Sequence, residues 1–185
     1  MRTLIVVPHM LTAAEVTTQL DALPSDFDAV SAEFWRYVDA KLTPLLRKVR
    51  VVLSATPPAP GGVQEAIIRR VLTCGGAARV IEDAALTSEV VAWRTMAETS
   101  DDPAALDLYR EAVQDLDRQL STAVDAALPA GGLGVLFLGV QGRPNLPGDV
   151  RVVTMTPFNP ADYLQRHRVA TRANVAGFAP PAGGR

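Results

Sequence analysis

Five short runs of apolar, largely β-branched residues recur along this chain, and segments of helical periodicity separate most of them. The runs lie near residues 3–7, 49–54, 78–82, 133–139 and 150–155. Near-continuous apolar strands are typical of parallel sheets, in which helices bury both faces. The sequence therefore predicts an α/β fold, namely a single three-layer domain with a mainly parallel five-stranded sheet.

A long helical pair is expected between the third and fourth strands, with its first helix from near Thr87 to Thr99. Its second helix has a clear start, because Asp102 is a capping residue and Pro103 suits the first helical position. Apolar residues then recur at three- and four-residue steps to about Leu128, which predicts a rod of roughly 40 Å at 1.5 Å per residue. Such a rod is longer than a small sheet can readily cover.

A second helical pattern precedes the second strand. Apolar residues recur at three- and four-residue steps from Phe27 to Val49 and predict an amphipathic helix there. The chain closes with an extended segment rich in Pro, Gly and Ala, a composition better suited to lying along a surface than to building a core. The expected organisation is an α/β domain over residues 1–165 and a C-terminal tail over residues 166–185.

Composition narrows the classes of partner. The 185 residues include 18 Lys and Arg against 20 Asp and Glu, so a net charge of −2 creates no field that attracts nucleic acid or an anionic membrane. No apolar run approaches the ~20 residues of a membrane-spanning helix, so no membrane insertion is expected. The single cysteine, Cys74, cannot form an internal disulfide, which agrees with a cytoplasmic location.

Candidate catalytic residues follow the predicted strands. His9 comes after the first strand, and Glu82 and Asp83 come after the third. Ligands collect at the carboxyl ends of parallel strands, and an imidazole with a carboxylate could perform acid–base chemistry there. The alternative interpretation of His9, Glu82 and Asp83 is structural. A lone imidazole is more often a packed group, and an acidic pair before a helix serves as a cap.

Two further places are candidates for ligand binding. Gly61 and Gly62 precede a helix and offer backbone N–H groups to an anion, although no complete phosphate-loop pattern accompanies them. Gln141 and Arg143 lie in the turn after the fourth strand, where a ligand could also bind.

Several short strings together resemble the TraB/ChaN-like group, which includes erythromycin-esterase-like and TIKI-like metal-dependent hydrolases. They are the first strand with His9, the Phe34-Trp35-Arg36 helix before "KVRVVLSA", the acidic pair after strand three, and "GVLFLG" followed by "LPGDVRVV". The resemblance implies an α/β fold. It also implies a divalent metal held by a His after strand one, an acid after strand two and a His after the late strand, which together activate water.

This chain departs from that pattern at two of the three ligand positions. Ser54 and Ala55 follow strand two, and Gln141 and Gly142 follow the late strand, so neither place offers a good metal ligand. No metal and no cofactor are therefore expected. The favoured hypothesis is a non-catalytic accessory or structural subunit of a protein assembly. The alternative is a small hydrolase or ligand-binding enzyme with its site around His9 and Glu82.

An interface is predicted on the long helix and the tail, in a homo-oligomer or a hetero-complex with protein subunits. An exposed apolar stripe on so long a helix would exceed the usual few hundred Å² of a monomer surface. The interface residues expected are Leu106, Val113, Leu116, Leu120 and Val124 on the helix and Phe178 in the tail.

Overall fold

The computed structural model describes residues 1–8, 10, 24–55, 57–100, 102–138, 145–160, 162–164 and 166. Its strands are β1 (Arg2–Pro8), β2 (Val49–Ser54), β3 (Ala77–Val80), β4 (Leu133–Leu138) and β5 (Val150–Thr154). Its helices are α2 (Phe27–Leu42), α3 (Val63–Thr73), α4 (Ala84–Thr99) and α5 (Pro103–Ala127), with a 3-10 turn η1 (Thr43–Leu45) after α2. No helix among these residues is both long and apolar enough to cross a membrane.

The five strands form one sheet in the order β3-β2-β4-β1-β5, and all four pairings are parallel. The predicted parallel α/β sheet is confirmed. Strands β2, β4 and β1 lie inside the sheet, and β2 and β4 are its most buried members, whereas every residue of the edge strand β3 is exposed. Burial therefore follows position in the sheet, as the near-continuous apolar runs predict.

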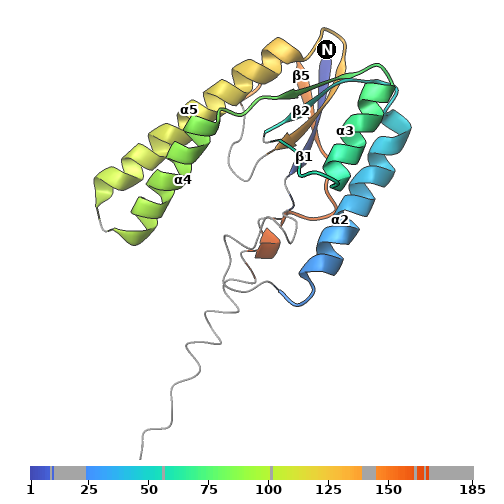
Figure 1. Ribbon diagram of the computed structural model, residues 1–185. Coiled ribbons are helices and arrows are strands. Elements are labelled where there is room, and N and C mark those ends of the chain that lie inside the picture. The colour runs from blue at the N-terminus through green and yellow to red at the C-terminus, as the bar shows by residue number, and fades with distance from the viewer. Residues whose placement is uncertain are drawn as a thin grey trace, which may run out of the picture.

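Helices α2 and α3 cover one face of the sheet (Figure 1). Phe34 and Trp35 of α2 pack at 84° with ring centroids 5.3 Å apart, and Phe34 also meets Phe158, from beyond β5, at 5.6 Å. Phe34 is completely buried, and these side chains join one core cluster with inward-facing residues of β1, β2 and β4. This cluster ties the segment after β5 to the helix before β2.

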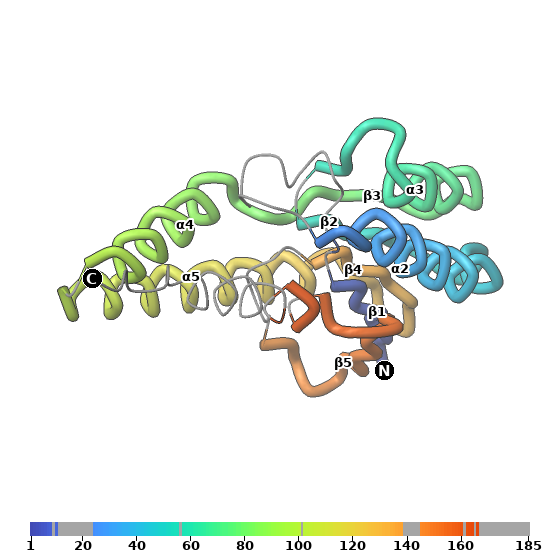
Figure 2. Tube along the Cα trace, turned by 90° about the horizontal axis from the view of Figure 1, so that it is seen from below, coloured from blue at the N-terminus to red at the C-terminus, as the bar shows by residue number. Residues whose placement is uncertain are grey.

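Helix α5 covers the opposite face, and α4 packs along α5 (Figures 1 and 2). Leu116, Leu120 and Val124 of α5 are fully buried against Leu4 and Leu136 of the sheet. Both figures show α4 and the first half of α5 extending past the sheet as a helical hairpin. We refer to residues 84–127 as the α4–α5 hairpin.

Two predicted helix boundaries differ from the structure. The helix predicted from Phe27 to Val49, α2, ends at Leu42. Pro44 cannot donate a backbone hydrogen bond, and the chain forms the 3-10 turn η1 there. Helix α4 begins at Ala84, ahead of the expected start near Thr87, because Asp83 caps it. The long helix α5 is confirmed and ends one residue before the predicted Leu128.

Candidate functional site

The strand order places a topological switch point between β2 and β4. From β2 the chain continues to β3 at one edge of the sheet, and from β4 it continues to β5 at the other edge. Ligands bind at such points in open α/β sheets, outside the carboxyl ends of the strands. Ser54, the last residue of β2, and Ala55, which follows it, are the described residues of this segment at the switch point. Whether a ligand could bind here therefore depends on the hydrogen bonds that these residues and their neighbours already make within the chain.

Hydrogen bonds within the chain hold the end of β2. Ser54 is 3% exposed, and its Oγ accepts a hydrogen bond of 2.7 Å from Nε2 of Gln64 in the first turn of α3. The N–H of Ala55 donates to the carbonyl of Phe137 in β4 at 3.0 Å. Ser54 thus anchors α3 to the sheet, a structural role that sequence reasoning missed because Gln64 carries no recognisable motif.

Gly61 and Gly62 do not present open N–H groups to an anion. The N–H of Gly61 donates to Oε2 of Glu65 at 2.6 Å, and the N–H of Gly62 donates to the carbonyl of Ala59 at 3.1 Å. The hydrogen bond from Gly61, followed by that from Arg69, holds the pKa of Glu65 below its ordinary value. A phosphate arriving here would meet a carboxylate that remains ionised, so the geometry favours a helix cap over an anion site.

Asp83 and Glu82 have different surroundings although they are adjacent. Asp83 is exposed, and its Oδ1 accepts hydrogen bonds from the N–H groups of Ala85 and Leu86, so it serves as the α4 cap. Glu82 is half-buried, and among the described residues its Oε2 is buried with no hydrogen-bond partner. Gln119 reaches the same strand end, because its Nε2 donates to the carbonyl of Ile81 at 2.7 Å.

The strand order separates the two halves of the predicted catalytic set. Two strands, β2 and β4, lie between β3, which leads to Glu82, and β1, which leads to His9. At about 4.8 Å per step the strands that lead to them are about 14 Å apart, too far for a direct hydrogen bond between an imidazole and a carboxylate. His9 itself, like Gln141 and Arg143, lies outside the described residues.

The three positions that the TraB/ChaN-like resemblance assigns to metal ligands follow β1, β2 and β4, which are neighbours in the sheet. Nothing else in the structure bears on that resemblance, and it stays a prediction. Within the described part of the chain, no group of three or more His, Cys, Asp and Glu side chains is placed to hold a metal ion.

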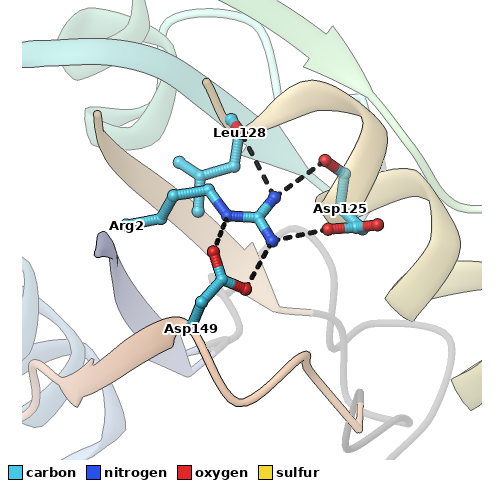
Figure 3. Close-up of polar contacts among 4 residues, drawn as sticks. All are labelled: Arg2, Asp125, Leu128 and Asp149. Atoms are coloured by element: carbon cyan, nitrogen blue, oxygen red, sulfur yellow. Dashed lines mark hydrogen bonds and ion pairs between the residues drawn. The ribbon is translucent and has the colours of Figure 1, made fainter. Parts of the chain in front are cut away.

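A polar cluster of one arginine and two aspartates lies at the opposite end of the sheet, where the strands begin (Figure 3). Arg2, at the start of β1, binds both carboxylate oxygens of Asp149 through Nε and Nη2 at 2.8 Å. Its Nη2 also pairs with Asp125 Oδ1 at 2.7 Å, and its Nη1 donates to the carbonyls of Asp125 and Leu128. One guanidinium therefore joins β1, the end of α5 and the segment before β5.

The electrostatics of this cluster are those of a structural clamp. The hydrogen bonds from Arg2 hold the pKa of Asp149 below its ordinary value, and Asp149 and Asp125 raise the pKa of Arg2. Arg2 also places positive charge against the last carbonyls of α5, where the helix dipole is negative. Sequence reasoning missed Arg2, because its partners lie 123 and 147 residues away.

Replacing Asp149 by asparagine is expected to lower the midpoint of thermal unfolding by a few degrees at neutral pH. A depressed carboxylate pKa stabilises the fold above the unfolded value of about 3.9, and this contribution is lost as pH falls through the folded value. The deficit of Asp149→Asn should therefore shrink below about pH 4. Thermal unfolding followed by circular dichroism from pH 7 to pH 3 measures this difference in midpoint.

Asp107→Asn is the control for this prediction. Asp107 is exposed and pairs only within α5, with Arg110 at 3.1 Å, a kind of surface pair that contributes little. Its midpoint should match that of the natural chain throughout the pH range. An Asp149→Asn deficit of the same size at pH 7 and pH 3 would contradict the assigned clamp.

The predicted interface stripe divides into a buried and an exposed part. Leu116, Leu120 and Val124 lie in the core of this chain, so their side chains are not available to a partner. Val113 is half-buried and Leu106 is 41% exposed, in the half of α5 that extends past the sheet. Phe178 lies outside the described residues. The sheet and α4 thus cover most of this predicted stripe, and of its residues on α5 an interface could use only Leu106 and Val113.

Among the described residues, ten large apolar side chains are exposed, and four of them lie on the α4–α5 hairpin. Val91 and Met96 of α4 and Leu106 and Leu108 of α5 are between 38% and 49% exposed. A shallow, open groove of about 440 Å³ continues along α5 toward the sheet. Its lining residues are Asp115, Arg118, Gln119, Thr122, Ala123 and Ala126.

Comparisons of this chain with protein-family models, with curated proteins and with solved structures found no match.

Proposed function

We propose that this chain is a non-catalytic subunit of a protein assembly and that the α4–α5 hairpin is its docking element. The observation that carries the proposal is the hairpin's extension past the sheet, with Val91, Met96, Leu106 and Leu108 exposed on it. Helix segments that extend past the core of a domain seldom leave several large apolar side chains in water unless they bind something.

The charge of the hairpin specifies the partner's chemistry. Residues 84–127 contain nine acidic and three basic side chains, whereas the whole chain has a net charge of only −2. A partner that covers this surface has to combine apolar side chains with positive charge, because opposite potentials favour encounter and like charges oppose it. The docking element thus selects a basic, partly apolar surface.

The enzyme alternative has less support from the geometry. It requires His9 and Glu82 at one site, and the strands that lead to them are separated by two others. The unpartnered Oε2 of Glu82 does favour a ligand with a hydrogen-bond donor, beside Gln119. Isothermal calorimetry with the natural chain and Glu82→Gln, using small ammonium compounds as probes, would reveal such a site.

Static light scattering across a dilution series tests the assembly proposal. The natural chain should show a mass above the 19.7 kDa monomer, or retain a protein partner through purification from its native host. The double variant Met96→Glu, Leu108→Glu should return to the monomer mass or lose that partner, because buried carboxylates in an interface are costly.

The matched control is Leu72→Glu on α3, which is 48% exposed and lies away from the hairpin. It should leave the mass and the partner unchanged. A monomer at every concentration with no retained partner would reject the proposal. So would an assembly that the hairpin variant leaves intact.

A further inference from the structure

We infer that the C-terminal segment, residues 167–185, binds the α4–α5 hairpin. This inference rests on the proposed function, because it names what occupies the docking element. The argument combines the exposed surface of the hairpin with the charge and length of the chain beyond Arg166, the last described residue.

The binding surface is a stripe along α5. Leu108, Asp115 and Thr122 are spaced by seven residues and therefore lie on one side of the helix. Asp115 and Thr122 line the groove described above, so Leu108 continues that groove toward the free end of the hairpin. Met96 belongs to the last turns of α4, level with the first turns of α5 in the antiparallel pair (Figure 1). The surface offers exposed apolar groups at one end and a shallow channel behind them.

Negative charge surrounds this stripe. Glu89, Glu98, Asp107 and Glu111 are all exposed on the hairpin. Asp107 is paired with Arg110 at 3.1 Å, whereas Glu111 makes no ion pair among the described residues. The three arginines of the hairpin do not neutralise its nine carboxylates. An added cationic segment would therefore gain from the potential of the whole hairpin as well as from single contacts.

The C-terminal segment has the complementary chemistry. Residues 167–185 include Arg168, Arg172 and Arg185 and no acidic side chain, with Phe178 and Val175 as apolar anchors. Aromatic and arginine side chains are both enriched at protein interfaces.

The C-terminal segment is long enough to cover the proposed binding surface on α5. Nineteen residues span up to about 60 Å when extended, at roughly 3.3 Å per residue. Helix α5 is about 38 Å long, from 25 residues at 1.5 Å each. The segment can follow the stripe from the groove to Leu108, on its own hairpin or on that of a second copy. Any other partner of the hairpin then has to displace it.

Paramagnetic broadening in the full chain tests this inference directly. Cys74 is the only cysteine and is exposed, so Cys74→Ser with Ala182→Cys allows a nitroxide to be attached near Phe178 alone. In ¹⁵N-labelled protein, amides around Met96 and Leu108 should lose most of their signal intensity, and amides of α3 should keep theirs. A mixture of ¹⁵N-labelled chain and unlabelled, spin-labelled chain shows whether the hairpin belongs to a second copy. Broadening in either sample supports the inference.

Two charge-matched variants complete the experiment. Arg168→Glu, Arg172→Glu, Arg185→Glu should restore the hairpin signals. Arg36→Glu, Arg47→Glu, Arg50→Glu changes three exposed arginines elsewhere by the same charge and should leave the broadening in place. Hairpin signals that stay intact in both labelled samples would overturn the inference, as would equal effects of the two variants. Because this readout needs no outside partner, its failure leaves the assembly proposal to be judged by light scattering.

Discussion

Phe34→Ala is expected to lower the free energy of unfolding by about 3–5 kcal/mol, the range for removing a buried phenylalanine side chain. Phe34 is completely buried, with ring centroids 5.3 Å from Trp35 and 5.6 Å from Phe158. Its loss opens a cavity between α2 and the segment after β5, so both should be affected. Urea unfolding followed by circular dichroism gives the size of the change, and Trp35 fluorescence, measured with Trp93→Phe in both chains, reports on the cavity itself.

Glu33→Ala is the matched control on α2, because Glu33 is the adjacent residue and is exposed. Its effect should stay within about 0.5 kcal/mol, as is usual for a surface substitution without special contacts. A Phe34→Ala effect below about 1 kcal/mol would mean that this ring is not part of the core.

Leu120→Ala is expected to cost about 2–5 kcal/mol, whereas Leu106→Ala should change stability by less than about 0.5 kcal/mol. The two leucines lie 14 residues apart on the same side of α5, so their helical setting is alike. Leu120 is fully buried against the sheet, and Leu106 is 41% exposed where the helix has passed beyond it. Chemical unfolding of both variants compares one residue type in two environments.

Equal losses in the two variants would contradict this division of α5 into a half that packs on the sheet and a half that extends past it. Leu106→Ala should still matter in the assembly assay, where it removes apolar surface from the proposed interface without disturbing the fold. The pair of variants therefore separates effects on stability from effects on association.

Local patterns in the sequence predict the elements of the fold well. The capping Asp102 with Pro103 marks the start of α5, and the apolar runs mark all five strands to within two residues. Local patterns do not predict the order of the strands in the sheet. Nothing local in "GVLFLG" indicates that β4 inserts between β2 and β1, since that position depends on contacts between residues more than 80 apart in the chain.

The same limit applies to the candidate site. Glu82 and His9 both follow strands, so sequence alone could join them, but the strand order places β3 and β1, the strands that lead to them, about 14 Å apart. Leu116 and Leu106 have the same periodicity in α5, and only the end of the sheet distinguishes the buried one from the exposed one. The sequence around Arg2 does not indicate its role, because its partners Asp149 and Asp125 become its neighbours only in the folded chain.

The position of β1 has a consequence for how this chain is made. Both neighbours of β1 in the sheet, β4 and β5, come from the last third of the sequence, and Thr3 pairs with Leu133. A ribosome adding 5–20 residues per second needs roughly 6–26 s to reach Leu133 after it has finished Thr3. For that time "TLIVV" has no native strand to pair with, while β2 and β3, joined by α3, already have each other. Nascent-chain chaperones that shield apolar segments should therefore be engaged at the very first strand and released only when the fourth emerges.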